Sequence, residues 1–417
     1  MSRTALPTLM VGICLLAGCS PTPPWTKTYG GPASETGWGI VPAQDGGYYI
    51  VGTRDLRFTG ERQANIMLMR IDAAGEVVWE KSFGGDGIDQ GRSILRASDG
   101  GLVIGAQGTS FEAGGIDATL MKVDENGNEV WSRTYATPAD ELVTVVREMP
   151  GGGYALAGTV LDPDDVIADA GVAGYFGADR RSSPYVVRSD VEGNEIWSRT
   201  FDNGTNTLVS DALPTPDGGL LILASITYFP DGDDDLYLLR IDEQGNEIWS
   251  KTWAQGRTNG HGLIETADGN YLVTGSHARA EDTDRSEADF LFIKVDPEGN
   301  EIWNRTFGDP AMMDWGYGAV EVAGGGFLVT GTRTEDLHGT PENIVILKMD
   351  ESGQLLWEKE FETGTHNMFG ALLQKADGGL VISGSTRVAI GNFDVFLILT
   401  DPEGNAVRPA GAAGSGG

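Results

Sequence analysis

The amino-acid sequence predicts an all-β fold that is built from repeats of a few short strands. Three observations support this prediction. The stretch GNEIWSRTF, residues 193–201, recurs in close copies that begin at Gly127, Gly245 and Gly299. Apolar residues show no long helical period after the N-terminus. Glycine contributes 61 of the 417 residues without a three-residue period, which excludes collagen and indicates many tight turns.

The repeat has a period of slightly more than 50 residues. The tryptophan of the stretch has equivalents that are separated by 54, 52, 66, 52, 54 and 54 residues. Such a period is typical of a β-propeller or a solenoid, and four strand patterns in each unit favour the propeller. The equivalent residues are Trp25, Trp79, Trp131, Trp197, Trp249, Trp303 and Trp357.

The unit that follows Trp249 shows how one blade is divided into strands and turns. A DGN turn joins its first two strands, and a DPEG turn joins its last two. Glycine permits positive φ in the first turn, and Asp followed three residues later by Gly is a type I turn pattern. We expect the Lys or Arg that precedes this second turn to pair with the turn Asp. The expected strands are residues 262–267, 271–275, 290–295 and 300–307.

The strands of the repeat are out of phase with the chain termini, which predicts how the ring closes. The chain starts with a tryptophan strand at residues 25–29, whereas the last unit ends without one. We therefore expect a seven-bladed β-propeller of four-stranded blades over residues 25–408, closed by the N-terminal strand in the last blade. Apolar residues alternate onto both faces of the strands, which predicts sheets covered on both sides. Residues 409–417 are expected to form a flexible Gly/Ala tail.

The N-terminus has the pattern of a secreted protein. Arg3 precedes an apolar run over residues 6–17 that is too short to span a bilayer and fits a signal peptide. The sequence LAGC that ends at Cys19 resembles the lipobox of bacterial lipoproteins. The resemblance implies a signal peptide over residues 1–18 and lipid on Cys19, which would anchor the protein outside the cytoplasm, at an outer membrane or cell surface. A Pro-rich linker completes residues 19–24. An ordinary cleaved signal with an incidental cysteine is the alternative.

The segment D-x-x-G-x-x-x-W resembles the tryptophan-docking repeat of quinoprotein-type propellers. These include pyrroloquinoline-quinone dehydrogenases and the propeller lipoprotein of the outer-membrane barrel-assembly machinery. The resemblance implies that the seven tryptophans pack between blades. The quinoprotein turn has an additional residue that this sequence lacks, and no quinone-binding residue matches. The resemblance therefore implies a fold rather than an activity.

Strand order predicts that the tight turns gather at one end of the ring and the long connections at the other. Loops on a rigid scaffold commonly hold binding residues, so we expect the long-loop end to bind. Its largest loop, residues 161–184, is either functional or a disordered decoration. The residues of this loop that are best suited to grip a partner are Tyr175, Phe176, Arg180 and Arg181.

One residue of each innermost strand is expected to line the central channel. Counting back seven residues from each hairpin gives a set that differs chemically between blades, as in either a ligand-specific ring or a solvated rim. The set is Trp38, Arg92, Thr144, Ser210, His261, Tyr317 and Gly370, and we place Trp315 at the channel rim beside it.

Metal and nucleic-acid sites are not expected. The net charge of −32 disfavours nucleic acid as a partner. The stretch DGDDDL places Asp231, Asp233 and Asp235 at calcium-loop spacing, but Leu236 stands where that loop needs glycine. A solvated acidic hairpin is the favoured interpretation, with calcium as a weak alternative. The four histidines form no closely spaced ligand pair. We expect no cofactor.

These observations predict a monomeric, lipid-anchored propeller of the cell envelope. Its expected role is a non-catalytic binding or scaffold module for a protein or a glycan, through the long-loop end. No nucleophile motif, phosphate loop or separate carboxylate pair indicates an enzyme. Two alternatives stay open: an extracytoplasmic enzyme, either polysaccharide-active or quinone-dependent, and a purely structural envelope component. The residues that would support an enzyme are Trp38, Arg92, His261, Trp315 and Tyr317.

Overall fold

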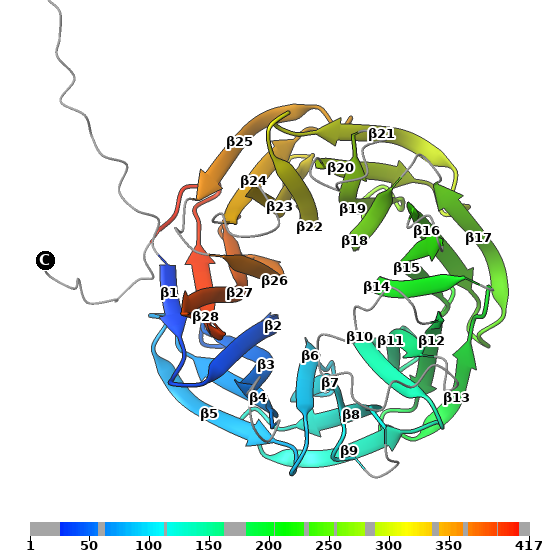
Figure 1. Cartoon of the computed structure of the whole chain (residues 1–417), viewed down its shortest axis with the longest axis vertical. Coiled ribbons are helices and arrows are strands. Elements are labelled where there is room, and N and C mark those ends of the chain that lie inside the picture. Colours follow the sequence, from blue (N-terminus) through cyan, green and yellow to red (C-terminus); the bar gives the residue numbers. More distant parts are fainter. Residues whose placement is uncertain are drawn as a thin grey trace, which may run out of the picture.

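The computed structural model of this chain forms a ring of β-sheets around a central axis (Figure 1). The described part of the chain contains 28 strands, and it has no helix long and apolar enough to cross a membrane. The structure describes residues 26–56, 63–111, 115–161, 181–203, 205–228, 233–253, 257–279, 288–335, 342–361, 366–389 and 391–407.

Hydrogen bonding groups the strands into five four-stranded sheets and one eight-stranded sheet. The eight-stranded sheet consists of two four-stranded groups joined by one parallel pair, Ala288 and Met313. We call each four-stranded group a blade and number the blades from β2–β5 onward. The neighbouring strands within each blade are antiparallel, and the grouping fits the predicted propeller.

The four strands of each blade occupy successive distances from the axis. The innermost strands are β2 (Ser34–Pro42), β6 (Asp89–Arg96), β10 (Asp140–Glu148), β14 (Asn206–Pro214), β18 (Thr258–Glu265), β22 (Met313–Glu321) and β26 (Asn367–Gln374). The second strands are β3 (Tyr48–Leu56), β7 (Leu102–Gly108), β11 (Tyr154–Leu161), β15 (Leu220–Tyr228), β19 (Tyr271–Ala278), β23 (Phe327–Thr334) and β27 (Leu380–Ala389). The third strands are β4 (Asn65–Ile71), β8 (Asp117–Val123), β12 (Ser182–Ser189), β16 (Asp233–Ile241), β20 (Ala288–Val295), β24 (Asn343–Met349) and β28 (Asn392–Leu399).

The outermost strands carry the tryptophan repeat. They are β5 (Val77–Phe83), β9 (Glu129–Tyr135), β13 (Glu195–Thr200), β17 (Glu247–Trp253), β21 (Glu301–Phe307) and β25 (Leu355–Phe361), together with β1 (Thr26–Tyr29) in the last blade. β1 pairs antiparallel with β28, from the opposite end of the chain, with Tyr29 opposite Val395 (Figure 1). The out-of-phase repeat predicted this pairing of the first strand with the last blade.

The glycine of the repeated turn has two structural tasks. Gly193 has φ of 79°, a conformation that side chains disfavour. A Cβ atom on it would also lie 2.6 Å from the ring of Trp131 in the preceding blade. In five other blades the turn glycine lies similarly close to the tryptophan ring of the blade before it. These tryptophans therefore lie between blades, as the resemblance implies. The other pairs are Gly127 with Trp79, Gly245 with Trp197, Gly299 with Trp249, Gly353 with Trp303 and Gly404 with Trp357. Trp25 lies outside the described residues.

The hydrophobic core is divided into clusters that each join two neighbouring blades. One cluster combines Val51 and Leu68 of the first blade with Ile104 of the second, and another joins the last blade to the first. Coverage of both faces is confirmed for the second and third strands of the second blade, since every residue of β7 and β8 is buried. It is wrong for the outer strands, because neighbouring blades diverge with distance from the axis. The aliphatic residues before the tryptophans are 49–59% exposed: Val78, Val130, Ile196, Ile248, Ile302 and Leu356.

The basic residue before the turn has a different partner from the predicted one. Lys122 pairs with Asp99 of the hairpin at 2.5 Å, and Lys294 pairs with Asp268 at 2.7 Å. The turn carboxylates are already occupied, because they accept hydrogen bonds from the backbone of their own turns; Asp124, for example, accepts from the backbone N–H of Asn126 and Asn128. These ion pairs therefore connect the two tight turns at the same end of a blade.

Candidate functional site

Each innermost strand contains a β-bulge at the corresponding position. The register with the second strand skips one residue, and a bulge re-aims the side chain of the skipped residue. The skipped residues are the seven that sequence counting assigned to the channel: Trp38, Arg92, Thr144, Ser210, His261, Tyr317 and Gly370.

The bulged residues line one axial cavity of about 570 Å³. Apart from Phe369, the other residues around the cavity follow the bulges along the inner strands, toward the hairpins, as Arg96, Arg147 and Leu373 do. The cavity therefore lies between the bulges and the tight-turn end of the ring. We expected binding at the opposite, long-loop end, and most residues of those loops lie outside the described part of the chain.

Aromatic rings form part of the wall at the level of the bulges. The ring of Tyr317 stacks on that of Phe369, with centroids 5.2 Å apart and planes inclined by 6°. On its other side, Tyr317 lies 5.0 Å from the ring of His261. Burial lowers the pKa of His261 to about 4, so its imidazole is neutral at physiological pH. The guanidinium of Arg92 lies 4.2 Å from the ring centroid of Trp38.

A second polar pair lies in the cavity wall nearer the hairpins. The Arg147 guanidinium donates to an Asp211 carboxylate oxygen at 2.7 Å. The same carboxylate accepts from the backbone N–H of Leu263 at 3.1 Å, which ties the fourth blade to the fifth. Burial raises the pKa of Asp211, although Arg147 opposes the rise. Sequence reasoning missed this pair because the two residues belong to different blades, 64 positions apart.

A buried carboxyl group lies close to Tyr317. Glu342 is buried, and its Oε2 lies 3.4 Å from Nδ1 of His366. Burial raises the pKa of Glu342 to about 7, and the charge of Glu342 contributes to a raised pKa of Tyr317. No sequence signal indicates Glu342, because it directly precedes a third strand in a connection that does not repeat.

Buried polar side chains also recur near the start of each innermost strand. Glu35, Asp89 and Asp314 accept hydrogen bonds from the backbone of the connection that enters the strand. Glu141 accepts from the Thr137 hydroxyl instead, and burial raises its pKa to about 7. These residues fix the entering chain, so their role is structural. The complete set is Glu35, Asp89, Glu141, Thr207, Thr258, Asp314 and Asn367. Each of these residues lies three positions before the bulged residue of its strand. This regular spacing is a signal that sequence reasoning missed.

The remaining predicted site residues are not brought to the cavity. Trp315 is half-buried on β22 and does not line it, because it precedes the bulge at Tyr317, whereas the cavity lies on the hairpin side of the bulges. Arg181 is exposed before β12. Three binding candidates and two other predicted residues lie outside the described part of the chain: Tyr175, Phe176, Arg180, Cys19 and Asp231.

The acidic stretch forms strand rather than a calcium loop. Asp233 begins β16 and Asp235 continues it, so the chain here is extended and paired with β15. Asp235 is buried, which differs from the solvated hairpin that the sequence favoured. Among the described residues, no group of three or more potential metal-ligating side chains is found.

Comparison with known proteins supports the fold alone. No protein-family model matches the sequence, and no curated protein matches it. The structure is similar to a puromycin hydrolase, with a TM-score of 0.52, 17% identity, and coverage of 92% of this chain and 54% of that one. A mutant of the same hydrolase gives a TM-score of 0.52 at 18% identity, covering 93% and 55% of the two chains. An α-L-arabinofuranosidase from Fusarium graminearum gives 0.47 at 13% identity, covering 74% and 92%. The chain thus spans about half the length of the hydrolase.

Proposed function

We propose that this protein is a seven-bladed β-propeller, anchored in the cell envelope by lipid on Cys19, that binds a glycan in its axial cavity without chemically changing it. The ring of bulged residues carries this proposal. The frame residues repeat from blade to blade, whereas the bulged side chains that line the cavity differ. A frame needs no such variety, and a ligand-specific site does.

The chemistry of the cavity suits a saccharide. Its volume of about 570 Å³ lies within the range of small-molecule sites. Its wall contains the aromatic rings of Trp38, Tyr317 and Phe369, which offer apolar surface to a sugar ring. Thr144, Ser210 and His261 add hydrogen-bonding groups for hydroxyls. A protein partner at the long-loop end stays a prediction.

Replacing Tyr317 tests where the glycan binds. We expect Tyr317→Ala to weaken binding about tenfold or more, because it removes one ring and the support of Phe369. The matched control is Trp315→Ala, an aromatic residue of the same strand that does not line the cavity, which is expected to change affinity less than about twofold. Calorimetric titration of the mature domain against a saccharide panel measures both.

The two variants also distinguish the two ends of the ring. Lost binding in Trp315→Ala with unchanged binding in Tyr317→Ala would place the site outside the cavity. Failure of the unaltered domain to bind any saccharide of a broad panel would contradict the proposed glycan ligand. Melting curves of both variants verify that each one is folded.

A polysaccharide-active enzyme is the second candidate function, favoured by the position of Glu342, which does not line the cavity itself but lies buried behind Tyr317 of its wall. A buried carboxyl group with a pKa near 7 is protonated often enough at neutral pH to act as a general acid. If this protein cleaves glycosidic bonds, the rate is expected to fall as pH rises through about 7, where the acid loses its proton. Glu342→Gln is expected to remove turnover and preserve binding. Chromatography of glycans after incubation, with Glu141→Gln as a buried-carboxyl control, measures this; absence of any product rejects this second function.

A further inference from the structure

The axial cavity differs in charge from the rest of the protein. The chain as a whole carries a net charge of −32. Around the cavity, the charged side chains are the guanidinium groups of Arg92, Arg96 and Arg147 and the single carboxylate of Asp211. The acidic surface repels an approaching anion. The positively charged cavity nevertheless attracts an anion that has entered it, since field lines concentrate in an enclosed site.

Two of the three arginines already have carboxylate partners. Arg147 pairs with Asp211, and Arg96 pairs with Glu125. Arg92 differs: within the described part of the chain, its guanidinium makes no ion pair or hydrogen bond, and its one specific contact is the ring of Trp38. The indole N–H of Trp38 is likewise buried without an acceptor among the described residues. Neither polar group of this stacked pair is satisfied by the protein.

Arg92 is half-buried in the cavity wall, and an unpaired guanidinium there is unfavourable for the protein alone. Burial lowers the pKa of Arg92 to about 10, and no nearby carboxylate offsets this cost of desolvation. The group nevertheless stays charged at physiological pH. Stacking on Trp38 occupies one face of the guanidinium, whereas its N–H edges point in the plane of the group and match the two oxygens of a carboxylate.

We propose that Arg92 is the anion-binding residue of the axial cavity and that the glycan bound there carries a carboxylate, as a uronic acid does. This inference rests on the proposed function. One unpaired cation matches a ligand with one negative charge. A phosphorylated sugar would bring up to two charges into a cavity that also holds Asp211, so the carboxylate is the better match.

Paired saccharides that differ only in the carboxyl group test this inference. Oligosaccharides of hexuronic acid and their carboxyl-reduced, neutral counterparts are titrated into the mature domain at low and high salt. We expect the acidic form to bind about tenfold or more tightly, with a preference that shrinks as salt rises. Arg92→Gln is expected to abolish the preference. Arg96→Gln, the matched control in the same cavity wall, is expected to retain it because Arg96 is already paired.

Stability gives a second readout that a merely structural Arg92 would not produce. In the absence of ligand, Arg92→Met is expected to melt at the same temperature as the unaltered domain or higher, because an unpaired, partly desolvated charge is removed. A clear fall in the melting temperature would show that Arg92 supports the fold and would overturn its assignment to a ligand. Arg92→Lys keeps the charge without the bidentate edge and is expected to retain only part of the preference.

The outcomes separate this inference from the proposed function. Equal binding of acidic and neutral saccharides by the unaltered domain overturns the carboxylate inference and leaves the glycan site intact. Binding of neither form contradicts both. Inorganic phosphate and acetate serve as competitors in the same titration, and stronger displacement by phosphate would overturn the choice of a carboxylate.

Discussion

Deletion of residues 25–30 is expected to lower the melting temperature of the mature domain by roughly 5–10 °C. These residues contain β1, which pairs with β28 over four residue pairs and joins the two ends of the chain (Figure 1). Tyr29 is buried between the last and first blades, and its hydroxyl donates to the carbonyl of Gly75 at 2.9 Å. The deletion removes this contact and exposes the edge of β28.

Two control variants isolate the contribution of the strand. Deletion of the linker, residues 19–24, leaves β1 in place and is expected to leave the melting temperature unchanged. Tyr29→Phe removes only the hydroxyl group and is expected to cost about 1 kcal/mol. Calorimetry measures all three variants. A melting curve unaffected by loss of β1 would show that this pairing does not hold the ring closed.

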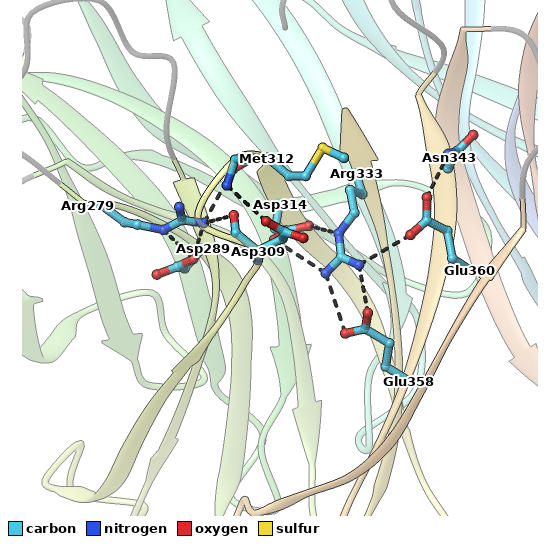
Figure 2. A network of polar contacts seen from close by, with 10 residues as sticks. Arg279, Asp289, Asp309, Met312, Asp314, Arg333, Asn343, Glu358 and Glu360 are labelled. Atoms are coloured by element: carbon cyan, nitrogen blue, oxygen red, sulfur yellow. Dashed lines mark hydrogen bonds and ion pairs between the residues drawn. The ribbon is translucent and has the colours of Figure 1, made fainter. Parts of the chain in front are cut away.

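Replacement of Arg333 by methionine is expected to destabilise the protein by about 3–5 kcal/mol, the usual cost of leaving one partner of a buried ion pair unpaired. Arg333 donates to Asp314 at 2.6 Å, and the Asp314 side chain is 0% exposed. It also pairs with Glu358 at 2.7 Å and with Glu360 at 3.3 Å. Figure 2 shows these three carboxylates converging on one guanidinium.

The network continues from Asp314 into the neighbouring blade. Asp314 accepts from the backbone N–H of Asp309, and Arg279 contacts the carbonyl groups of Asp309 and Met312 (Figure 2). Arg279 also donates to Asp289 at 2.6 Å. Loss of Arg333 therefore affects the connection between the fifth and sixth blades as well as the three carboxylates that it pairs with.

The repeat provides a matched control for Arg333. Arg54 occupies the corresponding place in the first blade, opposite Asn65 as Arg333 is opposite Asn343. Arg54 pairs with Glu80 at 2.9 Å, and the side chains of both residues are 28% exposed, whereas the Arg333 side chain is 7% exposed. Arg54→Met is expected to cost less than about 1 kcal/mol. The double variant Arg333→Met with Asp314→Asn is expected to recover part of the lost stability. Urea unfolding measures each variant, and equal costs at the two arginines would contradict the role assigned to burial.

Much of the frame could be predicted from the sequence because local rules specify it. Gly193 is needed where φ is positive, and the regular spacing of tryptophans such as Trp249 and Trp303 reveals the repeat before any contact is known. Counting along the repeat also identified Trp38, Arg92, His261 and Tyr317 as channel residues, since every inner strand has its bulge at the same place.

The partners of those residues could not be predicted, because they come from other blades. The sequence does not indicate that Trp38 lies against Arg92, or that Asp211 pairs with Arg147. Nor does it indicate that Trp315, two residues before Tyr317, stays out of the cavity, because only the structure shows that the cavity lies on the hairpin side of the bulges.

The all-β repeat, its turns, the residues that could line the channel and the strand that closes the ring can all be derived from the amino-acid sequence. The hollow side of the bulges, the arginine that lacks a partner and the carboxyl groups that are desolvated become known only from the folded ring. The difference arises because turn geometry and strand alternation depend on neighbouring residues in the chain. Burial and charge pairing depend instead on contacts between blades, which residues as far apart as Arg92 and Trp38 acquire only when the ring has formed.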